Sequence, residues 1–138
     1  MKKSLLFIMG LFLTFSVSVS ANSIDEVKYK AAKAISILKA DGYHIKSAKA
    51  GYLNEKGYKT FSITLYKGNT YQFIGVGDSN VKDLDVKIYD ENWHLVEKDT
   101  DSSSVSIAMI TPKWTGTFYV KTKIYRGHGY WVQLSAWK

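Results

Sequence analysis

The pattern of hydrophobic positions changes its period once along the chain, near Gly42. Before this glycine, apolar residues recur at spacings of three and four, with lysines between them, and this period predicts one amphipathic helix over Ser23–Ala40. Ser23 and Glu26 fit the S-x-x-E capping box at its start, and Gly42 suits the left-handed position after its end. We expect residues 22–42 to pack on the rest of the domain. The apolar stripe is Ile24, Val27, Ala31, Ile35 and Leu38.

After Gly42 apolar and polar residues alternate with a period of two, which is typical of half-buried β-strands. With weaker segments included, about eight short strands follow one another, separated by turn residues. No helix is predicted between them, so the pattern excludes a doubly wound parallel sheet. It predicts a mainly β fold in which residues 43–138 form an antiparallel β-sandwich of jelly-roll or Greek-key type, with one polar face on each strand.

The first 21 residues have the features of a secretory signal peptide. Lys2 and Lys3 precede an apolar run at residues 5–15, and Val19-Ser20-Ala21 supplies small residues before a cut. We therefore expect cleavage after Ala21 and a periplasmic or secreted protein. The apolar run is shorter than the roughly 20 residues that span a bilayer, so no stable membrane insertion is expected.

The amino-acid composition limits the binding partners and the chemistry that can be expected of the protein. The chain has 138 residues, which suits one domain, and it has no cysteine, which excludes disulfides, thiol chemistry and cysteine-ligated zinc. Its net charge is +7, yet eight of its twelve acidic residues lie between residues 78 and 101, so the charge is unevenly distributed. The lysines are scattered and Arg126 is the only arginine, so we expect no nucleic-acid partner. We expect a monomer.

Three segments carry a resemblance to a known family. They are a G-x-x-Y element at residues 68–71, DLDVKIYD at residues 83–90 and GTFYV at residues 116–120. In this order they resemble the bacterial pre-peptidase C-terminal (PPC) domain, over about residues 50–137. The resemblance implies a small, secreted, non-catalytic β-sandwich, often appended to exported peptidases and in some cases binding polysaccharide or fibrous protein. Because this chain carries no peptidase domain, it resembles a free-standing version.

The acidic segment supplies candidate metal ligands. Asp83, Asp85, Asp99 and Asp101 offer carboxylate oxygens, which are the ligands that calcium prefers. Calcium is the one cofactor that the sequence suggests, although the spacing is not that of an EF-hand loop, because its glycine is missing. The other interpretation is that these aspartates cap turns through hydrogen bonds to nearby backbone groups.

Aromatic side chains supply candidate ligand contacts. Strand parity or a turn position directs several of them toward solvent, where flat rings on a β-sandwich can stack on sugars. The candidate ligand-binding residues are Trp93, Tyr89, Trp137 and, in a glycine-rich loop, His128. The alternative for an aromatic residue is burial in the core, and we expect this for Trp131 and Trp114.

No catalytic motif appears in the sequence. There is no G-x-S-x-G, no H-E-x-x-H and no glycine-rich phosphate loop, and the three histidines are too far apart to suggest a zinc pair. We therefore expect no enzyme, and the leading hypothesis is an exported binding or accessory module that engages polysaccharide or an envelope protein. Two alternatives stay open: a structural envelope or stress protein stabilised by calcium, and a partner or inhibitor of an exported hydrolase.

Overall fold

The computed structural model describes residues 23–138, so the predicted signal peptide lies outside the described residues. One helix, α2, precedes eight strands, which confirms the predicted mainly β class. Within the described part of the chain, no helix is long and apolar enough to cross a membrane. In chain order the elements are α2 (Ser23–Ala40), β1 (His44–Leu53), β2 (Tyr58–Leu65), β3 (Tyr71–Gly77), β4 (Val81–Tyr89), β5 (Leu95–Asp99), β6 (Val105–Ile110), β7 (Gly116–Gly127) and β8 (Gly129–Trp137).

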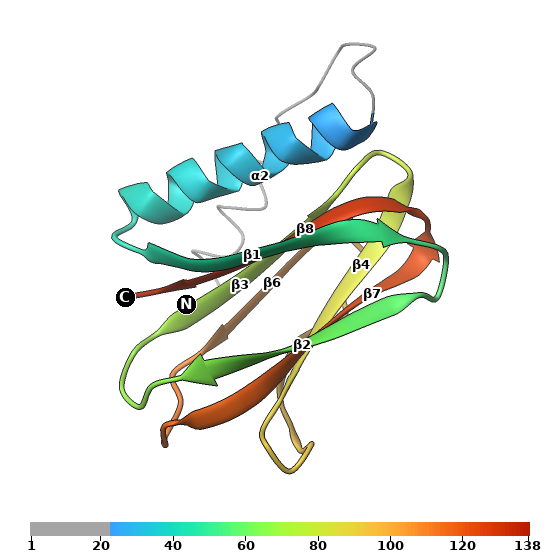
Figure 1. Cartoon of the computed structure of the whole chain (residues 1–138). Helices are drawn as coiled ribbons and strands as arrows, with labels where there is room; N and C mark the ends of the chain where they lie inside the picture. Colours follow the sequence, from blue (N-terminus) through green and yellow to red (C-terminus); the bar gives the residue numbers. More distant parts are fainter. Residues whose placement is uncertain (1–22) are drawn as a thin grey trace.

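The strands form two four-stranded antiparallel sheets that face each other (Figure 1). We call the sheet with order β1-β8-β3-β6 the helix-side sheet, and the sheet with order β2-β7-β4-β5 the outer sheet. The first strand pairs with the last, β2 with β7, β3 with β6 and β4 with β5. This nested pairing is the jelly-roll arrangement, in which one long hairpin is rolled into a sandwich.

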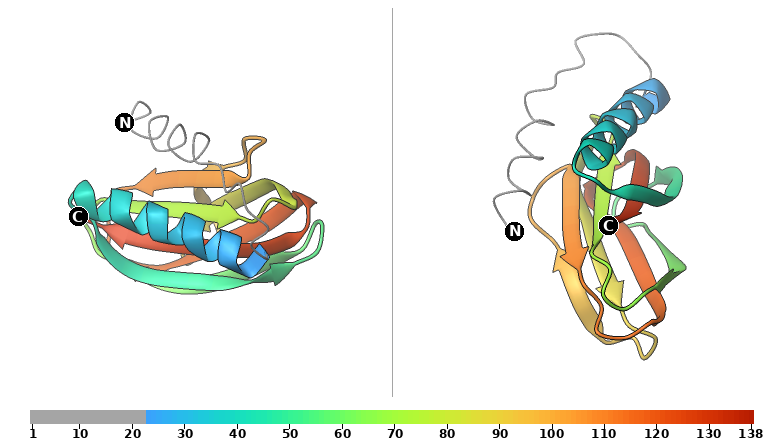
Figure 2. Two further views of the ribbon diagram at one scale, coloured as in Figure 1. Left: turned by 90° about the horizontal axis from the view of Figure 1, so that it is seen from above. Right: turned by 90° about the vertical axis from the view of Figure 1, so that its left-hand side faces the viewer.

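Helix α2 lies across the helix-side sheet, on the face turned away from the outer sheet (Figure 2). Its buried residues Val27, Ala31, Ala34 and Leu38 form one core cluster with side chains of the sheet, among them Ile74, Val76, Val132 and Leu134. The two inner strands of the helix-side sheet, β3 and β8, are therefore buried on both faces, and every residue of β3 is buried, whereas β1 at the edge has no buried residue. The expectation of one polar face on every strand is wrong for β3 and β8, because the helix covers the face that would otherwise meet water.

The N-terminal half of the helix is tied to the turn between β3 and β4. Glu26 Oε1 accepts a hydrogen bond from Ser79 N at 3.0 Å, and Lys30 Nζ donates to the carbonyl of Gly77 at 2.9 Å. Burial opposes ionisation of Glu26, but the Ser79 N–H and the Lys30 charge 3.2 Å away lower the pKa of Glu26 below its usual value. The sequence assigned Glu26 to a capping box; in the structure its carboxylate binds the β3–β4 turn. Gly42 has φ +87°, as its predicted position after the helix requires.

A second core fills the space between the two sheets. Phe73 of the helix-side sheet and Phe118 of the outer sheet are both fully buried there, beside Val86 and Ile88 of β4. Because side chains alternate along a strand, the packing of Val86 and Ile88 inward turns their neighbours outward, onto the free face of the outer sheet. This face holds the candidate site.

Candidate functional site

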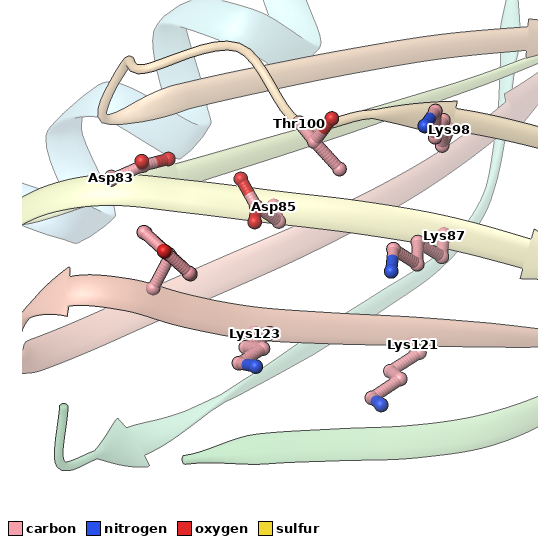
Figure 3. Close-up of a pocket in the computed structure, with 8 residues that line it drawn as sticks. Asp83, Asp85, Lys87, Lys98, Thr100, Lys121 and Lys123 are labelled. Atoms are coloured by element: carbon pink, nitrogen blue, oxygen red, sulfur yellow. The ribbon is translucent and has the colours of Figure 1, made fainter. Parts of the chain in front are cut away.

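The free face of the outer sheet carries a hollow with a volume of about 460 Å³ (Figure 3). Strands β4, β5 and β7 supply most of its wall, so the lining side chains stand on paired strands whose other face is packed in the core. We call it the lysine–aspartate hollow. It is lined by Asp83, Asp85, Lys87, Lys98, Thr100, Lys121, Lys123 and Tyr125.

Three of these lysines lie side by side across the sheet. The register places Lys87 of β4 opposite Lys121 of β7 on one side and opposite Lys98 of β5 on the other. Directly opposite residues have Cβ atoms about 5 Å apart, and like charges at such positions destabilise a sheet. None of the three makes an ion pair with a carboxylate of residues 23–138. We call Lys121, Lys87 and Lys98 the lysine row.

Two aspartates lie next to the lysine row on β4. A register shift between Asp83 and Leu84 interrupts the regular pairing with β7, and Asp83 and Asp85 are only 5% and 8% exposed. One carboxylate oxygen of each, Oδ1, has no hydrogen-bond partner in the described structure. Burial, followed by the close approach of the Asp83 carboxyl group and its charge, raises the pKa of Asp85 to about 6, although Lys87 acts in the opposite direction.

The raised pKa of Asp85 predicts an unusual pH dependence of stability. The unfolded carboxyl has a pKa near 3.8 and the folded one near 6. Between these values the folded state holds more protons than the unfolded state, so stability falls as the pH rises through this window. Asp85→Asn removes the charge. We expect it to raise the free energy of unfolding at pH 7.5 by about 1–2 kcal/mol after screening by solvent in the hollow, and to change it little at pH 4.

Urea unfolding of wild type and Asp85→Asn between pH 4 and pH 8 measures this difference. Asp101→Asn is the matched control, because Asp101 is an exposed aspartate outside the hollow. Wild-type and Asp85→Asn stabilities that run parallel over the whole range would contradict the expected destabilisation by the Asp85 charge.

A second feature of the same face is a group of stacked aromatic rings at the end of β4. Trp93 is 55% exposed and stacks on Tyr119 of β7, with ring centroids 3.9 Å apart and ring planes 9° from parallel. Tyr89 lies beside it, with its centroid 5.8 Å from that of Trp93. We call Trp93, Tyr119 and Tyr89 the aromatic platform. The structure thus brings together two of the predicted ligand-binding residues, Trp93 and Tyr89, and adds Tyr119.

The turn that carries Trp93 is held in one conformation by Asp90. Asp90 Oδ1 accepts hydrogen bonds from the backbone N–H groups of Asn92 at 2.8 Å and His94 at 2.9 Å. These contacts, that of His94 first, lower the pKa of Asp90 below its usual value. Trp93 has φ +63°, a conformation that is strained for a bulky side chain and that persists only where surrounding contacts enforce it. The exposed ring is therefore presented by a rigid turn.

The other two predicted ligand-binding residues lie elsewhere. His128 follows Gly127, which pairs with Val81 at the end of β4 opposite to Tyr89, and its Nδ1 is 3.0 Å from the hydroxyl of Tyr52. Trp137 ends β8 in the helix-side sheet, and its ring centroid lies 4.7 Å from that of His44. Neither residue belongs to the aromatic platform or lines the hollow.

The four candidate calcium ligands do not form one site. Asp99 faces away from the hollow: its Oδ2 accepts from Ile107 N at 2.8 Å and its Oδ1 from Asp101 N at 3.1 Å. Burial raises the pKa of Asp99, although these two N–H groups lower it. Across residues 23–138, no group of three or more histidine, cysteine, aspartate or glutamate residues is placed to hold a metal ion. Of the four, Asp99 accepts a hydrogen bond from the backbone two residues later, as the turn-capping interpretation predicts, whereas Asp83 and Asp85 lie inside β4; Asp78 and Asp90, also in the acidic segment, make the same kind of bond.

Trp131 and Trp114 were both predicted to be buried, and the structure confirms this for Trp131 only. Trp131 is 3% exposed and packs between the sheets with Leu84 and Ile124, as expected. Trp114 is 42% exposed, so its predicted burial is wrong; its ring lies against Phe118 at a centroid distance of 5.7 Å. It stands in the loop before β7, where a large side chain can lie on the surface of the sandwich rather than inside it.

Fold and site define the chain as a jelly-roll β-sandwich with a helix over one sheet and a lysine-rich, aromatic-flanked face on the other. Among solved structures it is similar to PliG of Aeromonas hydrophila, a periplasmic lysozyme inhibitor of g-type lysozyme, with a TM-score of 0.54 and 8% sequence identity. The match covers 71% of this chain and 90% of that protein, and it shows a shared fold. No protein-family model and no curated protein sequence matches the chain, and its resemblance to the PPC domain stays a prediction.

Proposed function

We propose that the protein is an exported, non-catalytic partner of a hydrolase, and that it inhibits a lysozyme. The observation that supports this most is the fold shared with a periplasmic inhibitor of g-type lysozyme, of which 90% of the chain is matched. The predicted signal peptide suits the same compartment, and the sequence carries no catalytic motif. This favours the partner-or-inhibitor alternative over a dedicated polysaccharide-binding module and over a calcium-stabilised structural protein.

The aromatic platform is the surface that we assign to the enzyme contact. Tryptophan and tyrosine are enriched among the residues that carry most of the binding energy at protein interfaces. Trp93 is largely exposed and already stacked on Tyr119, and Asp90 holds its turn. Little side-chain and backbone freedom would be lost on binding, so more of the contact energy appears as affinity.

Lysozyme assays on a suspension of bacterial cell walls test this function. The purified protein is added to lysozymes of several classes, the g-type included, and we expect it to slow lysis by at least one of them at micromolar concentration or below. Trp93→Ala should raise the inhibition constant at least about 30-fold, the equivalent of roughly 2 kcal/mol for an interface hot spot. The physical reason is the loss of the exposed ring at the centre of the contact.

Trp114→Ala is the matched control, because Trp114 is also an exposed tryptophan stacked on an aromatic ring but lies outside the platform. Its inhibition constant should stay within about threefold of wild type. Absence of inhibition in every lysozyme class would count against the proposed function. Inhibition that Trp93→Ala leaves intact would remove only the assignment of the contact surface.

A further inference from the structure

We propose that the lysine–aspartate hollow binds an acidic saccharide, that is, a short sugar chain that carries negatively charged substituents beside its free hydroxyl groups. The ligand would lie on the free face of the outer sheet, with its anionic groups on the lysine row and its hydroxyl groups on Asp83 and Asp85. This proposal concerns a ligand site and does not rest on the inhibition of a lysozyme.

The lysine row is the reason for proposing a ligand that carries negative charge. Three ammonium-bearing side chains occupy directly opposite positions on β7, β4 and β5, without a carboxylate partner in the described structure. Lys123 lies opposite Asp85, so the hollow has two parts: the lysine row, and an aspartate end with Asp83, Asp85 and Lys123. Like charges placed opposite each other cost stability. An anion bound among Lys121, Lys87 and Lys98 would offset this repulsion. The lysine row therefore favours a ligand with a negative group.

Asp83 and Asp85 are the reason for proposing a ligand that also carries hydrogen-bond donors. Oδ1 of Asp83 and Oδ1 of Asp85 have no partner, although both side chains are more than 90% buried. Leaving a buried acceptor without a donor costs about 1–3 kcal/mol, more for a charged group. A hydroxyl group donates to such an oxygen, whereas a fully ionised simple anion does not. A ligand that satisfies both parts of the hollow must therefore carry negative charge and hydroxyl groups together.

The two parts are spaced as such a ligand needs. Asp85 and Lys87 are two residues apart on β4, which separates them by about 7 Å along the strand, and both side chains stand on the same face. Figure 3 shows the aspartates toward one end of the hollow and Lys87, Lys98 and Lys121 toward the other. The volume of about 460 Å³ falls within the range of small-molecule sites, roughly 300–1,000 Å³. The spacing and volume suit a chain of a few sugar residues.

A metal cation fits the hollow less well. Only two carboxylates line it, and four lysines surround them, so a divalent cation would meet fewer oxygens than calcium takes and would be repelled by the ammonium groups. The same lysines attract an anion over several ångströms, an attraction that added salt weakens. The balance of charge in the hollow therefore favours an anionic ligand.

Isothermal titration calorimetry at pH 7.5 and low salt, with three probes, tests the proposal. The probes are trigalacturonate, which is acidic; cellotriose, a neutral sugar of the same length; and inorganic sulfate, a fully ionised anion without a hydroxyl group. We expect trigalacturonate to bind with a Kd of about 1 mM or below, cellotriose to bind at least about tenfold more weakly, and sulfate likewise. Binding of trigalacturonate should weaken when 0.5 M sodium chloride is added.

Lys87→Gln separates ligand binding from folding. It should weaken trigalacturonate binding at least about tenfold and change the midpoint of thermal unfolding little, because the repulsion from Lys98 and Lys121 and the attraction to Asp85 are lost together. Lys39→Gln, on the exposed end of α2, is the matched control and should change neither value. Asp85→Asn should weaken trigalacturonate binding and leave sulfate binding unchanged.

Three results would overturn the proposal. The first is cellotriose binding as tight as that of trigalacturonate. The second is trigalacturonate binding that survives Lys87→Gln unchanged. The third is sulfate binding as tight as that of trigalacturonate, which would reduce the hollow to a plain anion site. None of these results bears on lysozyme inhibition, and failure of that inhibition leaves all three measurements valid.

Discussion

Asp78→Ala is expected to lower the free energy of unfolding by about 3–4 kcal/mol. Asp78 is completely buried, and its carboxylate accepts hydrogen bonds from Asn80 N and Tyr130 N, both at 2.9 Å. It thereby joins the turn after β3 to the start of β8. A hydrogen bond to a charged group contributes about 1.5–3 kcal/mol, and the truncation leaves two N–H groups without their acceptor. The loss is a large fraction of the 5–15 kcal/mol that typically stabilises a domain.

Two further substitutions serve as comparisons for the loss of stability in Asp78→Ala. Asp78→Asn keeps one acceptor oxygen and should lose about half as much stability in urea unfolding. Glu91→Ala removes an exposed acidic side chain from the β4–β5 turn and should change stability by less than about 0.5 kcal/mol. An Asp78→Ala variant as stable as Glu91→Ala would show that the carboxylate does not hold the two segments together.

Leu38→Ala is expected to cost about 3 kcal/mol, the second large effect. Leu38 is 1% exposed in the last turn of α2 and belongs to the cluster between the helix and the helix-side sheet. Truncating a buried leucine removes apolar contacts and leaves a cavity, which typically costs 2–5 kcal/mol. Chemical unfolding followed by far-ultraviolet circular dichroism measures the loss.

The matched control for Leu38 is on the same helix. Ile24→Ala shortens an aliphatic side chain that is 39% exposed, and we expect a loss below about 1 kcal/mol. Similar losses for the two variants would mean that the helix is not docked as a third layer. A large loss for Leu38→Ala alone supports the arrangement in which the helix seals the sheet.

The local elements could be predicted because their signals lie close together in the chain. The helix Ser23–Ala40 has an apolar stripe and a glycine at its end, and its predicted bounds are those of the structure, although Ile24 of the predicted stripe is 39% exposed. Strand β3 has a local signal of the same kind, an apolar run with turn residues on either side. The jelly-roll class followed from the number of alternating segments and the absence of helices between them.

The faces of β8 could not be predicted in the same way. Alternation places Val132 and Leu134 on one face of the strand and Trp131 on the other, without saying what covers either face. In the structure Trp131 packs between the sheets, and Val132 and Leu134 pack under the helix. Alternation reports which residues share a face but does not report how many layers cover the sheet. Both faces of β8 are buried only because α2 packs on the face that is turned away from the outer sheet.

The candidate site was predictable only in part. Trp93 lies in a turn and Tyr89 at the end of the strand before it, so their proximity follows from a local hairpin. Lys98 and Lys121 are brought to Lys87 by the register of three strands, which no local pattern specifies. Lys121 and Lys123 lie on β7, between β2 and β4 inside the outer sheet, so neither lysine protects a sheet edge. Trp137 was a candidate because of strand parity and His128 because of its glycine-rich loop, and the fold separates both from the platform.

The place of β8 in the fold has a consequence for the order in which the chain can acquire its structure. Strand β8 lies between β1 and β3, so the helix-side sheet lacks one of its two inner strands until β8 is in place. Contacts between residues so distant in sequence form slowly, because a long loop must close first. A folding intermediate that has not yet placed β8 therefore has unpaired strand edges on β1 and β3. The docking of β8 is the step that closes the helix-side sheet.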